Sequence, residues 1–456
     1  MSLVIIGGGI VGLSIAYYST LADPSRKVII VDSEKSLFLS ASGFSGGYIV
    51  RDWFSPSVLP LAELSFLLHR QLAEDHNGRK LWGYTPSNGY SLVMEQGPEA
   101  GGKKVRGEDW LLHGTSRAEV ARTYVSRSLA NSGSDKNVKR DSLLRPDGSP
   151  LWTNIPAGGV LEKISSPSGC AQVEPRQLCE WLLQRCEERG VEVHLGTKTV
   201  AFAKDSQGSI VGLHVQKHSA KTGQPIPEII PCKDVVISGG CWTPRIFQTL
   251  VGEKMSIGIR PLPGYSIVVR SPRYNRPILE DDESAQQVET SHSIFYPPGP
   301  DWKYSPEAMA RQTRDGRPEI FVAGLNNEAH LLPELAGGSK AMMEEPLMND
   351  LKKTAFKLVS TQTGASAGDD LEIVREGLCF RPVSESGIPI ISEVGDIKTK
   401  TGGRLYVASG HGPWGITLSL ATGFVMSEVL QGKAPSVSLD DFKLKSESSF
   451  ALRPRL

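Results

Sequence analysis

The chain begins with a short apolar segment, a glycine turn and a longer apolar segment. Residues 3–6 are a continuous apolar run that ends at glycine, which is typical of a buried parallel strand. Residues 10–21 have apolar positions at helical spacing, and residues 27–31 form a second apolar run that ends at Asp32. The pattern predicts one strand–helix–strand unit at the N-terminus.

Similar patterns recur along the chain. Helical spacing predicts helices over residues 51–73, 177–189 and 418–430, and the second of these ends at Gly190, a residue that commonly follows a helix. Apolar runs predict strands over residues 191–195, 200–203, 234–238 and 405–409. Residues 96–150 are rich in polar residues, glycine and serine, so we expect an insertion of surface loops there.

The charge balance excludes some classes of partner. Lysine plus arginine and aspartate plus glutamate each number 50, so the formal net charge is zero. No basic excess is available to bind nucleic acid or an anionic membrane. With 456 residues, the chain is long enough for two or three domains.

The cysteines predict neither a metal site nor a disulfide framework. The six cysteines contain no CxxC pair and no histidine at zinc-finger spacing. We therefore expect reduced, mostly buried thiols. The N-terminus shows no signal-peptide pattern, and no apolar run is long enough to span a membrane. We therefore expect a cytoplasmic protein. A peroxisomal location is the weaker alternative, because the C-terminal Pro454-Arg455-Leu456 is a poor match to the peroxisomal Ser-Lys-Leu address.

The glycine turn matches a dinucleotide-binding motif. Residues 7–12 read Gly-Gly-Gly-Ile-Val-Gly and fit G-x-G-x-x-G, directly after a predicted strand and at the start of a predicted helix. Gly7 permits the tight turn, Gly9 lets the backbone approach a pyrophosphate, and Gly12 allows close packing of helix and strand. Asp32 follows about 20 residues later, where a ribose-binding acid is expected.

The motif alone does not separate NAD from FAD. Residues 41–49, Ala-Ser-Gly-Phe-Ser-Gly-Gly-Tyr-Ile, are rich in small side chains. Such a bare backbone suits a segment that lies against a flat aromatic ring system. This segment favours FAD.

These motifs and three later segments together resemble a known family. The later segments are residues 239–243 (Gly-Gly-Cys-Trp-Thr), residues 409–416 (Ser-Gly-His-Gly-Pro-Trp-Gly-Ile), and Arg381-Pro382 with residues 387–391. In this order they resemble the FAD-dependent oxidoreductases of D-amino-acid-oxidase type, which include glycine oxidase, monomeric sarcosine oxidase and fructosyl-amine oxidases. The resemblance covers nearly the whole chain except residues 96–150. Residues 295–296 and 318–324 most resemble a fungal branch of predicted amine oxidoreductases.

The resemblance implies an α/β fold with two domains. A Rossmann-like FAD-binding domain would be discontinuous and comprise residues 1–80, 165–258 and 371–456. A second, α+β substrate domain, built on a mixed β-sheet, would comprise residues 81–164 and 259–370.

The resemblance also implies the residues around FAD. Val200 would contact adenine through its backbone, and the amides of residues 412–417 would point toward the flavin pyrimidine. Cys379 is either a covalent attachment point for the flavin or a buried inert thiol. The implied cofactor-binding residues are Gly7, Gly9, Ile10, Val11, Gly12, Asp32, Ser33, Ser42, Ser45, Gly46, Gly47, Val200, Gly240, Trp242, Cys379, Arg381, Gly412, Pro413, Trp414, Gly415, Ile416 and Thr417.

The implied activity is oxidation of the C–N bond of a small-molecule amine or amino acid. A hydride equivalent passes to the flavin, the imine product hydrolyses, and the electron acceptor is O2 or another oxidant. A substrate carboxylate needs a cation, for which Arg51 and Arg381 are the candidates. Tyr265 and Tyr296 would wall the pocket, and His411 completes the candidate catalytic set.

Two departures from the family pattern bear on the substrate and the acceptor. Thr417 stands where sarcosine-oxidase-like members have a lysine, and residues 321–325 lack the lysine that promotes reaction with oxygen. Other classes also remain open: an NAD(P)-dependent dehydrogenase, a flavin dehydrogenase of 2-hydroxy acids, and a non-enzymatic flavoprotein. A flavin monooxygenase is a further alternative, although Gly395-Asp396 is followed by Ile-Lys-Thr instead of the expected small residues.

Overall fold

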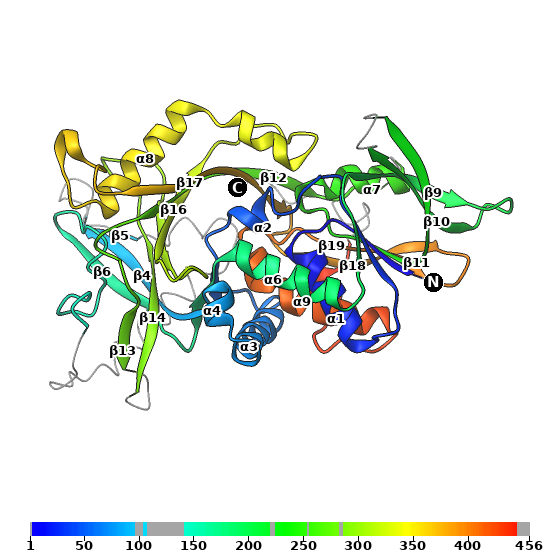
Figure 1. Cartoon of the computed structure of the whole chain (residues 1–456), viewed down its shortest axis with the longest axis horizontal. Helices are drawn as coiled ribbons and strands as arrows, with labels where there is room; N and C mark the ends of the chain where they lie inside the picture. The colour runs from blue at the N-terminus through cyan, green and yellow to red at the C-terminus, as the bar shows by residue number, and fades with distance from the viewer. Residues whose placement is uncertain are drawn as a thin grey trace.

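The computed structural model of the chain describes residues 2–95, 104–106, 141–218, 224–252, 255–281 and 286–444. Most of the predicted 96–150 insertion and the C-terminal tripeptide lie outside these ranges. Two β-sheets organise the described residues and lie beside each other along the long axis of the molecule (Figure 1).

Within the described ranges, the first sheet has eight strands and contains the N-terminal strand–helix–strand unit. Its order is β18-β19-β11-β1-β2-β8, and β10 joins β11 to β9. The pairs β1–β2, β1–β11, β2–β8 and β11–β19 are parallel. The strands are β1 Ser2–Ile6, β2 Val28–Val31, β8 Glu192–His194, β9 Thr197–Lys204, β10 Ile210–His218, β11 Pro225–Ile237, β18 Ile390–Lys398 and β19 Arg404–Ser409.

The second sheet has eleven strands in the described part of the chain. Its order is β17-β12-β16-β15-β14-β4-β7-β3; off this path, β5 and β6 pair with β4, and β13 pairs with β14. The pair β14–β4 is parallel, whereas β17–β12–β16–β15–β14 is antiparallel throughout. The strands are β3 Tyr48–Val50, β4 Thr85–Glu95, β5 Lys104–Arg106, β6 Gly159–Ser165, β7 Cys170–Gln172, β12 Ile259–Arg270, β13 Ile278–Asp281, β14 Gln287–Phe295, β15 Glu307–Arg311, β16 Glu319–Asn326 and β17 Glu372–Ser384.

Helices cover the sheets. The α-helices are α1 Ile10–Ala22, α2 Ala41–Phe44, α3 Leu59–Asp75, α4 Gly78–Trp82, α6 Pro175–Glu188, α7 Thr243–Val251, α8 Glu345–Val359 and α9 Gly415–Leu430. Short 3₁₀ helices are η3 Gly240–Trp242, η4 Ala336–Met342, η5 Gly364–Ser366, η6 Gly412–Trp414 and η7 Asp440–Phe442. Figure 1 shows α1, α3, α6 and α9 grouped on one side of the first sheet and α8 along the second sheet.

The apolar residues of β1 point into two different cores. Leu3 and Ile5 pack with α1 and α9, whereas Val4 and Ile6 pack in the cluster that contains Phe247 of α7. A strand covered on both faces needs apolar residues at every position, because alternate side chains point to opposite faces. This explains the continuous apolar run of residues 3–6 and confirms the predicted buried strand.

The fold agrees with the predicted α/β class and with the predicted mixed sheet, and both observed sheets are mixed. One predicted helix differs. The helix predicted from residue 51 begins only at Leu59. Pro56 disfavours helical backbone at Ser55, and Pro60 fits the first turn of the helix.

The two sheets do not follow the predicted domain boundaries strand by strand. Strands β3, β7 and β17 fall within the residue ranges predicted for the FAD-binding domain but pair in the second sheet. The division into domains at those boundaries stays a prediction. The six cysteines are buried and free of disulfides, which confirms the predicted thiols. In the ranges that the structure describes, no helix has the length and apolar character needed to cross a bilayer.

Candidate functional site

The glycine turn has the close contacts that its motif predicts. Gly7 has a φ of +111°, and a Cβ added there would lie 2.6 Å from the carbonyl oxygen of Ser238. A Cβ on Gly12 would lie 2.1 Å from the carbonyl oxygen of Gly7. Helix α1 therefore packs directly on the turn, and its first residue, Ile10, follows the last glycine of the turn.

Asp32, at the end of β2, is tied to this turn. Its carboxylate accepts hydrogen bonds from the backbone N–H groups of Gly8 (2.8 Å) and Glu34 (2.9 Å). Burial raises the pKa of the Asp32 carboxyl, and these two N–H groups oppose the rise. Asp32 thus presents an acceptor beside the N-terminus of α1, as a ribose-binding acid requires.

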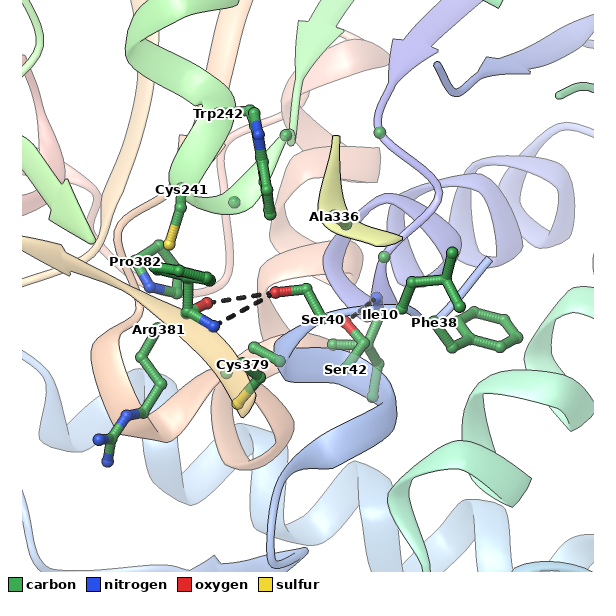
Figure 2. A pocket seen from close by; sticks show the side chains of 18 of the residues that line it. Ile10, Phe38, Ser40, Ser42, Cys241, Trp242, Ala336, Cys379, Arg381 and Pro382 are labelled. Atoms are coloured by element: carbon green, nitrogen blue, oxygen red, sulfur yellow. Dashed lines mark hydrogen bonds between the residues drawn. The ribbon is translucent and has the colours of Figure 1, made fainter. Parts of the chain in front are cut away.

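The small-residue segment lies against the same helix terminus. The N–H of Ile10 donates to the Ser42 hydroxyl at 3.0 Å, which links α2 to the start of α1 (Figure 2). The Ser40 hydroxyl, one residue before α2, lies 3.5 Å from both backbone polar atoms of Phe380 in β17. The start of α1, the segment around α2 and strand β17, which are far apart in the chain, therefore lie side by side here.

A large cavity of about 640 Å³ extends through this junction. It reaches from the glycine turn and Asp32 to the second sheet, and most of the predicted site residues line it. These are Gly7, Gly9, Ile10, Val11, Asp32, Ser33, Ser42, Ser45, Gly46, Gly240, Trp242, Tyr265, Cys379, Arg381, His411, Gly412, Pro413, Gly415 and Ile416. A smaller cavity of about 60 Å³ adjoins it and is lined also by Gly47 and Trp414.

Three predicted cofactor residues line neither cavity. Gly12 lies behind the turn, where it lets α1 approach. Val200 lies in β9 directly after Thr199, which does line the large cavity. Thr417 is buried, and its hydroxyl donates to the carbonyl oxygen of Tyr48 at 3.1 Å, so it holds α9 against β3.

Two predicted catalytic residues also lie outside both cavities. The Tyr296 hydroxyl is buried and lies 2.6 Å from the hydroxyl of Thr153. Arg51 lies 3.7 Å from the carboxylate of Asp52. The structure therefore brings Arg381, but not Arg51, to the cavity that the glycine motif opens.

The second sheet forms the roof of the large cavity. Along β15, the side chains of Ala308 and Ala310 belong to the core beneath α8. Because side chains alternate along a strand, Glu307, Met309 and Arg311 share the opposite face, toward the glycine turn. Met309 packs there in the core that contains α1.

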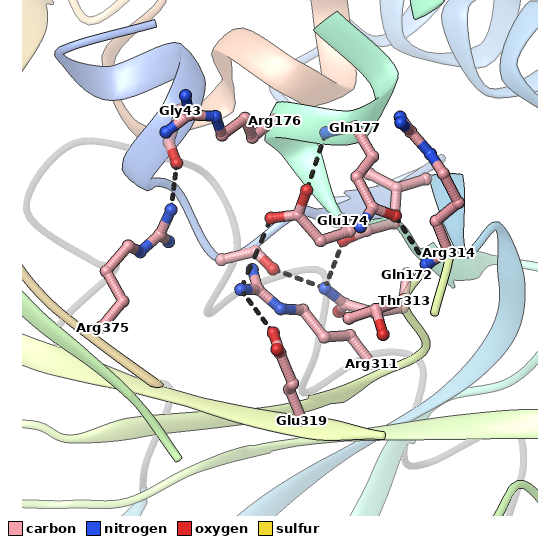
Figure 3. Close-up of polar contacts among 12 residues, drawn as sticks. Gly43, Gln172, Glu174, Arg176, Gln177, Arg311, Thr313, Arg314, Glu319 and Arg375 are labelled. Atoms are coloured by element: carbon pink, nitrogen blue, oxygen red, sulfur yellow. Dashed lines mark hydrogen bonds and ion pairs between the residues drawn. The ribbon is translucent and has the colours of Figure 1, made fainter. Parts of the chain in front are cut away.

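A buried ion cluster holds this roof to the first sheet's helices. Arg311 is 2% exposed and lies 3.4 Å from Glu174, the residue before α6, and 3.2 Å from Glu319 of β16 (Figure 3). On β17, at the end of the same sheet, Arg375 donates to the carbonyl oxygen of Gly43 in α2 at 2.6 Å. Because removing one member of a buried ion pair leaves an uncompensated charge, these contacts resist separation of the two sheets.

The segment that connects β16 to α8 closes the other end of the cavity, near Asp32. The Trp242 indole N–H donates to the carbonyl oxygen of Pro333 at 2.9 Å, and Arg245 donates to the same oxygen at 2.8 Å. Farther along, the N–H of Gly337 donates to Glu34 at 2.6 Å. Sequence patterns did not indicate this segment or Arg245, because the contacts join residues roughly 90 to 300 positions apart.

His411 is buried beside the large cavity in a neutral state. Burial lowers its pKa to about 4. The Thr422 hydroxyl donates to the carbonyl oxygen of Leu418 at 2.9 Å, so His411 Nε2, at 3.0 Å, donates to that hydroxyl. His69, which sequence analysis missed, is also buried and donates to the carbonyl oxygen of Ile416 at 2.9 Å. It thereby positions the first turn of α9.

Cys379 lines the large cavity as a protonated thiol. Burial raises its pKa, and Arg381 and Arg375 oppose the rise. A raised pKa disfavours the nucleophilic thiolate. Covalent attachment of a flavin at this residue stays a prediction.

The cavity walls contain polar atoms suited to a polar ligand. Within the described residues, the hydroxyls of Ser45 and Ser266, Arg381 Nε and Trp414 Nε1 are buried without a protein hydrogen-bond partner. All four residues line one or both cavities. Buried polar atoms are normally satisfied, so these atoms indicate a bound molecule with hydrogen-bonding groups along the cavity. An extended dinucleotide with a flavin at one end fits this wall.

Comparisons with known proteins show the family of this chain. A model of the family described as FAD dependent oxidoreductase (DAO) matches residues 2–429. A Schizosaccharomyces pombe protein named as an oxidoreductase is 24% identical over 445 residues, which cover 96% of each chain. The D-amino acid dehydrogenase of Methylobacterium sp. (strain 4-46) is 23% identical over 492 residues, which cover 97% of this chain and 98% of the dehydrogenase.

A solved structure shows the same fold. The glycine oxidase of Geobacillus kaustophilus superposes with a TM-score of 0.64 at 19% identity, over 97% of this chain and 98% of the oxidase. The family model covers most of the chain, including the glycine turn and the acidic residue after β2. This chain therefore belongs to the DAO family of FAD-dependent oxidoreductases.

Proposed function

We propose that this protein oxidises the C–N bond of a small amine or amino acid. The observation that carries the proposal is the large cavity. It joins the dinucleotide motif and Asp32 at one end to a roof that contains both a cation, Arg381, and an anion, Glu307, at the other. FAD, when bound, accepts a hydride equivalent from the carbon beside the substrate nitrogen.

The proposal assigns roles to the two ends of the cavity. Asp32 would bind the adenosine ribose hydroxyls, and the N–H groups at the start of α1 would face the pyrophosphate. The flavin ring would lie near Ser45 and Gly46, beneath the second sheet. A Cβ on Gly46 would lie 2.5 Å from the Met309 sulfur, so the segment passes as close to the roof as glycine allows.

Arg381 is the proposed partner of a substrate carboxylate. Its side chain lines both cavities, and one guanidinium nitrogen hydrogen-bonds to Asn326. Figure 2 shows the side chain extending away from Ser40 and Ser42. The Nε atom is buried and lacks a protein partner, which leaves a donor for a ligand. Arginine binds carboxylates through two parallel hydrogen bonds, so it both attracts and orients an amino acid.

The comparisons support this substrate class. Relatives named D-amino acid dehydrogenase and solved structures named glycine oxidase and L-amino acid deaminase all act, by name, on amino acids. Within the described residues, Lys198 is the one lysine that lines either cavity, and it lies near Asp32 and Thr197. Among the described residues, therefore, no lysine lines the proposed flavin end, where a lysine would promote reaction with oxygen. We propose an acceptor other than O2.

An anaerobic screen tests the proposed function. The purified protein should be yellow, and the flavin absorbance should bleach with at least one member of a panel of amino acids, N-methyl amino acids and polyamines. Mixing the reduced enzyme with air and separately with a quinone dye then compares the two acceptors. Bleaching only by NADPH would indicate a monooxygenase, and bleaching only by 2-hydroxy acids would indicate the alternative dehydrogenase.

A further inference from the structure

The smaller cavity has an unusual lining for its size. Three aromatic residues, Tyr48, Phe295 and Trp414, surround it together with Glu307 and Met309. Its volume of about 60 Å³ is roughly four times what one water needs. It therefore has room for a compact group of a few heavy atoms.

The aromatic walls form one packed group. The ring centroids of Tyr48 and Phe295 lie 5.7 Å apart. Trp53 packs behind them and holds the group together, 5.1 Å from Tyr48, 5.9 Å from Phe295 and 6.4 Å from Trp414. Tyr48, Trp53 and Phe295 are buried, so the positions of these rings are set by packing. Aromatic faces carry negative electrostatic potential and attract cations.

Glu307 is an acidic residue that lines the same small cavity as three of these rings. It lies at the start of β15, opposite Phe295 of β14 and Ala323 of β16 in the antiparallel register. Ala323 is small and lines the large cavity, so Glu307 borders open space on that side. Glu307 lines both cavities and is partly exposed.

We propose that the smaller cavity binds the cationic ammonium or N-alkylammonium group of the substrate. Glu307 supplies the countercharge, and Tyr48, Phe295 and Trp414 supply aromatic surface. Aromatic rings that line a small cavity are the groups that recognise alkylated ammonium ions.

Arg381, which lines the same cavity, would repel a bare cation but attract a carboxylate. The occupant is therefore a zwitterion whose carboxylate meets Arg381 and whose nitrogen lies near Glu307. This inference rests on the proposed function and narrows it to amino acids, including N-alkylated ones.

Two ligands of the same shape test the charge directly. Betaine has a quaternary nitrogen and cannot be oxidised by removal of a hydride beside a neutral amine. The anion 3,3-dimethylbutanoate has the same shape and carboxylate, with carbon in place of the charged nitrogen. Titration of the flavin absorbance of the holoenzyme, with calorimetry as a second readout, should show betaine binding at least about 10-fold more tightly.

Three variants then assign the preference to residues. Glu307→Gln should reduce the betaine affinity about 10- to 100-fold and leave 3,3-dimethylbutanoate binding equal or tighter. Glu307→Asp should retain part of the preference. Phe295→Leu should weaken betaine binding while keeping an apolar wall. Glu228→Gln, an exposed position on β11, is the matched control and should bind both ligands as the parent does.

Equal binding of the two ligands by the parent enzyme, or an unchanged ratio in Glu307→Gln, would overturn the inference. That failure is distinct from failure of the proposed function. A yellow protein that amino acids bleach but that does not prefer betaine loses only the inference, whereas a protein that no amine or amino acid bleaches loses both. The comparison in the parent enzyme needs no variant, so it decides the question even if Glu307→Gln does not fold.

Discussion

Asp32 offers a direct test of how the cofactor is held. We expect Asp32→Asn to lower FAD affinity, because an amide donates hydrogen bonds and carries no charge where the ribose hydroxyls need an acceptor. A hydrogen bond to a charged group contributes about 1.5–3 kcal/mol, which corresponds to roughly 10- to 150-fold in the dissociation constant. Asp32→Ala should lose more, since the N–H groups of Gly8 and Glu34 then also lose their acceptor.

The assay is the flavin content of the purified protein, followed by titration of the apoprotein with FAD by flavin fluorescence. Glu187→Gln, an exposed position on α6, is the control for loss of one carboxylate. Thermal unfolding of the apoproteins separates weaker binding from a weaker fold. A variant Asp32→Asn that is stable and retains stoichiometric FAD with the parental affinity would refute the reasoning.

The same residue predicts a dependence on pH. Burial raises the pKa of Asp32 above its ordinary value of 3.8, so the carboxylate takes up a proton at a higher pH than an exposed aspartate does. Protonation removes the charged acceptor, and FAD affinity should therefore fall as the pH falls through this raised pKa. Asp32→Asn should lack that step, and the two titrations together check the assignment.

Three further outcomes follow from the geometry. Arg381→Met should weaken binding of carboxylate ligands about 10- to 100-fold, measured by flavin titration. Arg51→Met should change this affinity less than about 3-fold. If Arg51→Met had the larger effect, Arg381 would be excluded as the partner of the substrate carboxylate. Gly12→Ala should prevent stable folding or FAD binding, because its Cβ would lie 2.1 Å from a carbonyl oxygen. Gly299→Ala, with open space around it, is the control, and its free energy of unfolding in urea should stay within about 0.5 kcal/mol of that of the parent. Burial lowers the pKa of His69 from 6.5 to about 4, so its neutral form stabilises the fold above pH 6.5, and this contribution is lost as the pH falls from 6.5 toward 4. In His69→Gln, the free energy of unfolding should therefore depend less steeply on pH over that range. An unchanged slope would contradict the assignment.

Sequence reasoning was most successful where the contacts are local. The glycine turn, α1 and β2 lie within 32 residues, and each local preference agrees with the others: an apolar strand, glycines where a Cβ would collide, and an acid at the strand end. The later segments were placed by their resemblance to a family, and they do meet at one cavity. Residues that shape this cavity without a motif, such as Ser266, Glu307 and His69, were not found.

The starting point of α3 shows a similar limit of sequence-based prediction within one helix. Helical spacing of apolar residues extends back to residue 51, but the prolines at positions 56 and 60 decide where a helix can begin. A periodic pattern shows that a helix is present more reliably than it shows where the helix ends.

By itself, the sequence determined the N-terminal strand–helix–strand unit and its glycine turn, because these depend on periodicity and on glycines within one short stretch. The α/β class of the whole chain and the later cofactor segments came from the resemblance to a family. Only the tertiary structure decided which arginine meets the cavity and which acid lies near it. Arg51 and Arg381 both flank family-like segments, yet the pairing of β17 with β12 places Arg381 in the roof, while Arg51 lies beside Asp52 outside both cavities. Glu307 reaches the same space through the register of β15 between β14 and β16. Strand pairing joins residues far apart in the chain, and a one-residue shift in register would turn each of these side chains to the other face of the sheet.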